Sequence, residues 1–195
     1  MACSNVMFCV WPFPHVSRVR ALLVVLASGW ALTACDNTVK LPQSDTTPPS
    51  ATLTAFPGNG GSVFGSNVHL EETGQDVSRK VGLKDTVQFL GVGEDDDGGV
   101  RKVSIIEGGA VSCDLGNGKF GNTSTFTAIV GQNQDPSNPT PGTSVPRTRA
   151  AGGSIAIDHG CAPQHVGTLQ ALVHVDAENY YGLKATTKTL TLTFP

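Results

Sequence analysis

The acidic turn at residues 94–99 holds the densest set of side chains that could bind a ligand. Its sequence is Glu94-Asp95-Asp96-Asp97-Gly98-Gly99. Carboxylate oxygens in a glycine-rich loop suit Ca²⁺. The turn lacks the ligand spacing of an EF-hand, and Asp and Gly also favour turns for local reasons. We therefore favour an ordinary acidic turn with no bound cofactor. The alternative is a calcium site that draws on Glu94, Asp95, Asp97, Asp176 and Asn179.

A second group of residues combines imidazoles with thiols. His159, Cys161 and His165 lie close together in the sequence, and His69, His174 and Cys113 could join them. Zinc and copper both accept such ligands. The spacing matches no established metal motif, so solvated loop histidines are the favoured interpretation and a zinc or copper site is the rival.

Catalytic signatures find little support in this chain. There is no Gly-x-Ser-x-Gly nucleophile elbow. Serines and histidines are scattered, and nothing in the sequence brings one beside another with an orienting acid. Most acidic residues fall in predicted turns, and so small a domain offers no obvious cleft for paired carboxylates. We predict that the protein is not an enzyme.

The stretch from Arg18 to Cys35 has the parts of an export signal in order. Arg18 and Arg20 precede an apolar run, residues 21–31, and Leu32-Thr33-Ala34-Cys35 follows. The run is too short to span a bilayer, which takes about 20 residues, so a retained transmembrane helix is the weaker interpretation. An ordinary cleaved signal is the stronger rival, because Ala31 and Ala34 also suit that protease. Translation could begin at Met1 or at Met7.

This stretch resembles a bacterial lipoprotein signal peptide, with LTAC as its lipobox. The resemblance implies that residues 1–34 are removed and that the Cys35 thiol receives a diacylglycerol. The new amino terminus would then be acylated, in many lipoproteins with palmitate. More than one acyl chain gives stable membrane attachment. The expected location is the bacterial cell envelope, lipid-anchored on the exported side of a membrane.

Export in turn predicts a disulfide bond. Cys113 and Cys161 are the only cysteines after Cys35, and exported proteins meet an oxidising compartment. We expect these two residues to pair and to close a loop across the long insertion described below.

Composition excludes one class of partner and favours one fold class. The chain carries 13 Lys and Arg against 16 Asp and Glu, a net charge of −3, which argues against binding to nucleic acid. Abundant glycine, sparse charge and recurring Thr and Val are typical of an all-β domain with many turns.

The chain after Cys35 divides into a tether and a domain. Residues 35–49 contain three prolines and are predicted to form a flexible linker, which could hold the domain up to about 40 Å from the lipid. Residues 50–195 show alternating strands, the clearest at 51–57, 85–92, 100–107, 169–175 and 189–194. Residues 131–153 are rich in Pro, Ser, Thr, Asn and Gly, and they are predicted to form a long loop.

The order of these features resembles the bacterial immunoglobulin-like domains of secreted and surface proteins. The matching residues are Thr46-Thr47-Pro48-Pro49, the acidic turn, and the run Val173–Asn179 before a Thr-rich last strand. Glu178 departs from the glycine expected there, and the core tryptophan of antibody domains is absent. The resemblance implies an antiparallel β-sandwich with the acidic turn, Asp176 and Asn179 at the end nearest the tether.

These observations together predict a membrane-anchored envelope lipoprotein that presents an immunoglobulin-like domain for structural or adhesive contact. Its expected partners are the membrane, through the lipid anchor, and a protein or glycan that the sequence does not identify. The alternative is an envelope module that binds a small ligand or a metal (Ca²⁺, or zinc or copper). An enzyme with an unrecognised site is a third, weaker alternative.

Overall fold

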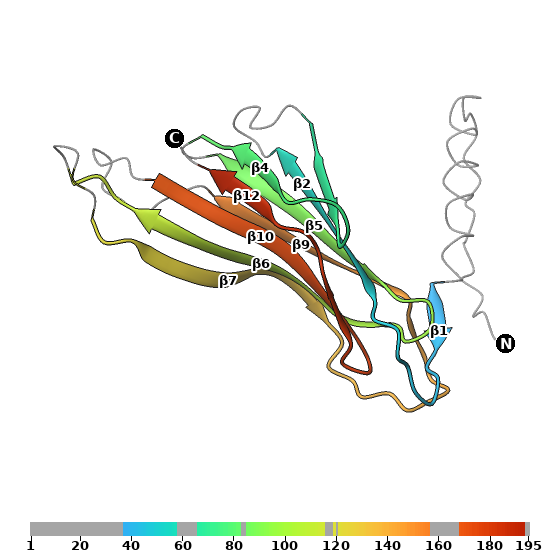
Figure 1. Cartoon of the computed structure of the whole chain (residues 1–195). Coiled ribbons are helices and arrows are strands. Elements are labelled where there is room, and N and C mark those ends of the chain that lie inside the picture. The colour runs from blue at the N-terminus through green and yellow to red at the C-terminus, as the bar shows by residue number, and fades with distance from the viewer. Residues whose placement is uncertain are drawn as a thin grey trace, which may run out of the picture. The chain divides into compact units, whose positions relative to one another are not determined.

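The computed structural model describes residues 37–57, 66–82, 85–115, 119, 121–156 and 168–193. These residues form twelve strands and contain no helix (Figure 1). Within them no helical segment has the length and apolarity needed to cross a bilayer. The strands are β1 Thr38–Lys40, β2 Ser50–Pro57, β3 Val68–Glu71, β4 Val77–Lys80, β5 Thr86–Glu94, β6 Val100–Ser112, β7 Ser124–Gln134, β8 Ser144–Pro146, β9 Thr148–Ala156, β10 Thr168–Asn179, β11 Lys184–Thr186 and β12 Leu190–Thr193.

Two sheets pack face to face as a sandwich. One has the order β3-β2-β5-β9, and the other has the order β4-β12-β10-β6-β7, with β11 beside β10. Strands β2, β5 and β9 correspond to A, B and E of a variable-type immunoglobulin domain, and β12, β10, β6 and β7 correspond to G, F, C and C′. All pairs are antiparallel except β4 with β12. The predicted all-β fold, with antiparallel sheets packed as a sandwich, is therefore confirmed.

The core lies between the sheets and follows from alternation along each strand. Leu53, Val87 and Phe89 face inward from the first sheet, and their neighbours in sequence are more exposed. The buried residues of the second sheet pack against them from the opposite side. These residues are Val103, Ile105, Ala171, Val173, Val175, Leu190 and Leu192. A fully buried Val or Leu side chain stabilises the fold by roughly 1.5–3 kcal/mol. This contiguous cluster is the main source of stability.

The prediction of a flexible linker over residues 35–49 is wrong from Asn37 onward. Strand β1 pairs antiparallel with β8, with Thr38 opposite Pro146 and Lys40 opposite Ser144. Leu41 and Pro49 are buried. The prolines do prevent a long strand, but the partner strand lies about a hundred residues further along the chain. Local composition carries no information about such a pairing. Cys35 and Asp36 lie outside the described residues, as does the predicted signal peptide 1–34.

The predicted long loop at 131–153 is also wrong in most of its length. Strand β7 continues to Gln134, and β8 pairs with β1. Strand β9 pairs with β5, with Thr148 opposite Glu94 and Ala156 opposite Thr86. Within this range only residues 135–143 and Arg147 lie between strands. The glycines that suggested a loop instead allow close approach between β7 and β9. A Cβ on Gly131 would lie 2.3 Å from the carbonyl oxygen of Gly152.

Candidate functional site

The acidic turn joins β5 to β6 and is organised by Asp95. This side chain is buried, with 4% of its surface exposed. Its Oδ1 atom accepts hydrogen bonds from the backbone N–H groups of Asp97 (3.1 Å) and Gly98 (2.6 Å). Asp side chains stabilise turns in this way. The turn geometry is therefore a local consequence of the sequence.

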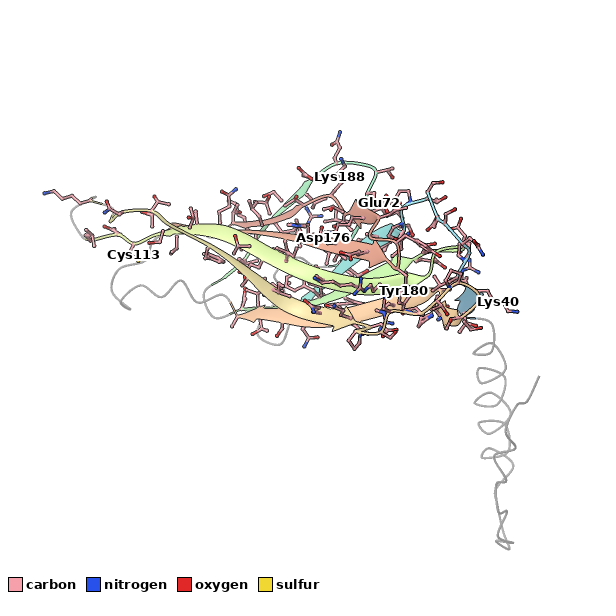
Figure 2. All side chains as sticks on the ribbon, turned by 90° about the horizontal axis from the view of Figure 1, so that it is seen from below. Lys40, Glu72, Cys113, Asp176, Tyr180 and Lys188 are labelled. Atoms are coloured by element: carbon pink, nitrogen blue, oxygen red, sulfur yellow. The ribbon has the colours of Figure 1, made fainter. Side chains whose placement is uncertain are left out.

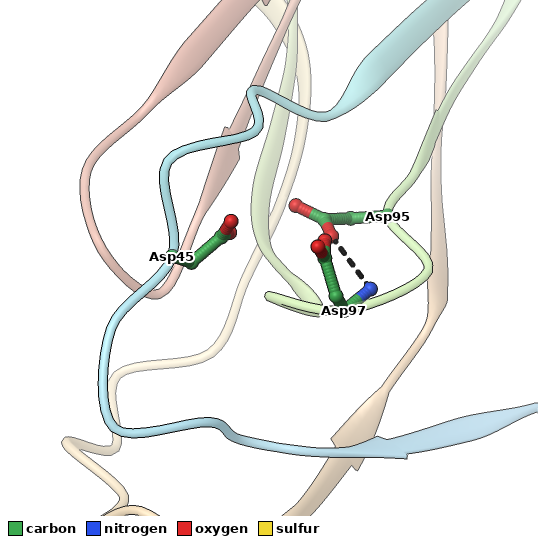
Figure 3. Close-up of side chains that lie close together, drawn as sticks. All are labelled: Asp45, Asp95 and Asp97. Carbon is green, nitrogen blue, oxygen red and sulfur yellow. Dashed lines mark hydrogen bonds between the residues drawn. The ribbon is translucent and has the colours of Figure 1, made fainter.

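Asp45 joins Asp95 and Asp97 from a distant part of the chain. It lies between β1 and β2, and its carboxylate faces the turn (Figure 3). One carboxylate oxygen from each of the three residues lies within 4.8 Å of the others. Asp45 is half-buried, Asp95 is buried and Asp97 is exposed, so the group opens to solvent on one side. Three hard oxygen ligands at this spacing are suited to Ca²⁺.

The Asn179 side chain is fully buried and donates hydrogen bonds to two of the carboxylates. Its Oδ1 atom accepts the backbone N–H groups of Tyr181 (3.0 Å) and Leu183 (2.9 Å). These two donors fix the orientation of the amide group, because only an oxygen can accept them. The Nδ2 atom therefore faces the carboxylates and donates to Oδ2 of Asp45 (2.7 Å), Oδ2 of Asp95 (3.2 Å) and the carbonyl of Thr47 (3.3 Å). Asn179 positions the carboxylates and presents no oxygen to them.

The negative charge of the three carboxylates is not neutralised by any cation among the described residues. Burial raises the pKa of Asp95 above its usual value, and the hydrogen bonds from Gly98 and Asp97 offset this in part. The nearby cation Arg147 pairs instead with Asp96 (2.5 Å) and Glu94 (3.7 Å). Among the described residues, no ion pair with Lys, Arg or His reaches Asp45, Asp95 or Asp97. The hydrogen bonds that described N–H groups donate to these three carboxylates all come from neutral backbone or amide groups.

The structure brings together only part of the sequence-based set of candidate calcium ligands. Asp95 and Asp97 do lie together. Glu94 pairs with Arg147, and Asp176 lies on β10, where its Oδ1 atom accepts from the Thr186 hydroxyl (2.7 Å) and lies 3.8 Å from His174 Nε2. Sequence reasoning missed Asp45 because it had been assigned to a free linker. Its position just before Thr46-Thr47-Pro48-Pro49 was the one available signal.

The alternative zinc or copper group is not assembled among the described residues. His69 lies on β3 and contacts Thr54 (2.9 Å), whereas His174 lies on β10 in the other sheet. His159, Cys161 and His165 lie outside the described residues. Cys113 is disulfide-bonded, and every other cysteine of the chain also lies outside those residues. The partner of Cys113 therefore stays a prediction.

Two adjacent tyrosines fasten loops at the same end of the sandwich. The Tyr181 hydroxyl donates to the carbonyl of Pro42, and the Tyr180 hydroxyl donates to Oδ2 of Asp135. The Tyr180 bond is the main reason that the pKa of Asp135 falls to about 2. Burial, followed by the bond to Asp135, raises the pKa of Tyr180 to about 12.

Tyr180→Phe is expected to lower the free energy of unfolding by about 1 kcal/mol near neutral pH, the usual worth of one such bond. The pKa of Asp135 in the folded state lies below the usual value of 3.8, so its contribution to stability is present above that pH and is lost as pH falls toward 2. The pKa of Tyr180 in the folded state lies above the usual value of 10.0, so its contribution to stability is lost as pH rises toward 12. Unfolding by urea across both ranges should therefore give flatter profiles for the variant. Tyr181→Phe, which loses a bond to a carbonyl, should keep the acid-range slope. Equal slopes in wild type and Tyr180→Phe would contradict the assignment.

The arrangement as a whole can bind a cation and can fix three chain segments together. Asp45, the acidic turn and Asn179 come from three separate parts of the sequence, and their hydrogen bonds link the entrance of β2 to the ends of β5 and β10. Comparison with known proteins adds no relative: no protein-family model and no curated protein matches this chain.

Proposed function

We propose that the protein is an envelope lipoprotein that presents an immunoglobulin-like sandwich for contact with a protein or glycan. The run of residues 18–35 carries the proposal, because charged, apolar and small residues precede Cys35 in the order that lipid attachment requires. The described part of the domain begins two residues after this run, at Asn37, and leads through β1 into the first sandwich strand, β2. A compact exported domain behind a lipid signal supports a presenting role.

Exposed apolar side chains support contact with a partner. Ile129 is 58% exposed and Leu172 is 37% exposed. Register places both on the outer face of the β7-β6-β10 sheet, since Ile129 and His174 lie opposite the same residue, Ile106, and Leu172 lies two residues before His174. Apolar side chains gathered on one outer sheet face support a contact surface there.

Cys35→Ser tests the lipid anchor directly. We expect the wild type to fractionate with membranes and to gain the mass of diacylglycerol plus an acyl chain, and the variant to be released without either. The reason is that stable attachment needs more than one acyl chain, all carried by residue 35. The measurement is intact-protein mass spectrometry beside membrane fractionation. Ala34→Ser keeps a small residue before the cleavage site and serves as the control. Continued membrane association of Cys35→Ser would contradict the anchor.

The same proposal includes a disulfide between Cys113 and Cys161. Cys113 directly follows β6, whose last residue Ser112 pairs with Thr168 at the start of β10. Cys161 precedes Thr168 by few residues, and the cysteines before Cys35 would be lost with the signal. Mass spectrometry of peptides from the unreduced protein would identify the linked pair.

Calcium binding at Asp45, Asp95 and Asp97 is a second candidate function. The specific observation in its favour is the convergence of three carboxylates that no described cation neutralises. A divalent ion there would offset the repulsion that burial strengthens around Asp95. It would also bridge the entrance of β2 to the acidic turn, so binding would stabilise the folded state.

Asp97→Asn is expected to abolish stabilisation by Ca²⁺. At a Ca²⁺ concentration tenfold above Kd the wild type should gain about 1.4 kcal/mol, which raises Tm by roughly 3–6 °C. Asn keeps the oxygen that accepts from Gly98 (3.0 Å) but removes the charge. Asp96→Asn is the matched control, because Asp96 pairs with Arg147 outside the cluster. Scanning calorimetry with Ca²⁺, and with Mg²⁺ for comparison, measures the effect. An unchanged wild-type Tm would exclude specific binding.

A further inference from the structure

We propose that the lipid anchor holds the β1–β8 end of the sandwich against the headgroup layer of the bilayer, with the opposite end directed away. The inference rests on the proposed lipidation of Cys35. It goes further, because it assigns a docking surface and an orientation that lipidation alone does not require. A domain on a long flexible linker would turn freely above the membrane.

The chain is fastened to the sandwich from its first described residue. The carbonyl of Asn37 accepts from the backbone N–H of Arg147 (2.9 Å), and β1 then pairs along its length with β8. After β1, Leu41 N–H donates to Thr143 (2.9 Å), and Leu41 accepts from Gly142 N–H (2.8 Å). Leu41 itself is buried, with 4% exposed. Residues 37–41 therefore belong to the domain.

The linker that remains between Cys35 and the first described residue, Asn37, is very short. Only Asp36 separates Cys35 from Asn37 in the sequence. Two residue steps of fully extended chain span about 7 Å, against the roughly 40 Å that a free linker over residues 36–49 would allow. The diacylglycerol on Cys35 would lie at the membrane interface. The β1–β8 ribbon would then lie within about one headgroup layer of it.

The surface at this end is polar and rich in carboxylates. Lys40 marks it in Figure 2, and Cys113 lies at the opposite end of the domain. The acidic turn abuts the ribbon, since a Cβ on Gly99 would lie 2.4 Å from Val145 and 3.3 Å from Val39. Asp45 and Asp97 therefore come close to the membrane with exposed Lys40. An anionic headgroup surface would repel these carboxylates, whereas a zwitterionic surface is net neutral and offers ammonium groups to them, so we commit to a zwitterionic headgroup surface as the occupant.

The orientation also determines which groups face outward. Leu115, 61% exposed, lies two residues beyond Cys113 and so belongs to the end directed away from the membrane. A partner in the surrounding space would meet this end of β6, β7 and β10 before it met the acidic turn.

Single tryptophans can measure this orientation in the lipidated full chain. Both natural tryptophans, Trp11 and Trp30, precede Cys35 and are lost on processing. Lys40→Trp places a reporter on β1, and Leu115→Trp places one at the far end. The proteins are reconstituted in phosphatidylcholine–phosphatidylethanolamine vesicles in which some headgroups carry a nitroxide quencher. We expect quenching of Lys40→Trp to exceed that of Leu115→Trp severalfold. Equal quenching, or more at Leu115→Trp, would overturn the orientation.

Two further variants keep the outcomes distinct. A ten-residue Gly-Ser insertion after Asp36 should abolish the difference between the two reporters, because a long flexible linker lets the domain turn. Thr38→Trp, also exposed on β1, replaces Lys40→Trp if that variant unfolds. A protein with no lipid mass and no vesicle binding would overturn the lipidation. Lipid mass with equal quenching at both ends would overturn the docking and leave the lipidation intact.

Discussion

Asn179→Asp is expected to lower the free energy of unfolding by about 3–5 kcal/mol at neutral pH, the usual cost of an unpaired buried charge. The Asn179 amide donates to Asp45 Oδ2 (2.7 Å) and to Asp95 Oδ2 (3.2 Å). A carboxylate at that position, which has no exposed surface, would replace the donor by a further negative charge beside the carboxylates of Asp45 and Asp95. Urea unfolding of wild type and variant measures the loss.

The pH dependence separates charge from geometry in this prediction. The introduced carboxyl would titrate in the folded state above its usual value near 4, because burial and the neighbouring carboxylates oppose its ionisation. A raised folded-state pKa means that stability is lost as pH rises, so the variant should recover as pH falls toward 4. Asn179→Ala is the control, since it removes the same hydrogen bonds without adding charge and should lose a similar amount at both pH values. An Asn179→Asp deficit independent of pH would contradict the argument.

Gly99→Ala is expected to cost about 2–4 kcal/mol and to loosen the β1–β8 ribbon. Gly99 has φ +64°, where a side chain is strained, and its added Cβ would lie 2.4 Å from Val145 and 3.1 Å from the carbonyl of Pro146. Backbone strain contributes about 1 kcal/mol, and overpacking contributes roughly 1–3 kcal/mol. Guanidinium unfolding measures the loss. Limited proteolysis should also cut the variant sooner within residues 37–49.

Gly182→Ala isolates the contact with the ribbon. Gly182 has φ +81°, but nothing lies within 4 Å of the position of its Cβ. This variant should therefore lose only about 1 kcal/mol from strain and should leave the β1–β8 segment resistant to protease. Equal losses in the two variants would show that the close packing of Gly99 under Val145 contributes nothing.

The candidate site was readable from the sequence only where its interactions are local. Asp95 closes a turn with N–H groups two and three residues ahead, and the Glu94–Gly99 run predicts that turn directly. Asp45 reaches the same turn from fifty residues away, so no local pattern connects them. The sequence also suggested Asn179 as an oxygen ligand. Its role as a donor depends on two backbone N–H groups that only the folded loop supplies.

The sequence by itself determined the all-β class and the strands whose alternation is strong, such as β2, β5, β10 and β12. In those strands each residue alternates between core and solvent, and the period is visible within a few residues. Tertiary structure alone decided β1, β8 and β9, because a three-residue or glycine-rich strand is stabilised by a partner distant in the chain. That long-range pairing turned a predicted linker into part of the domain and brought Asp45 to the acidic turn.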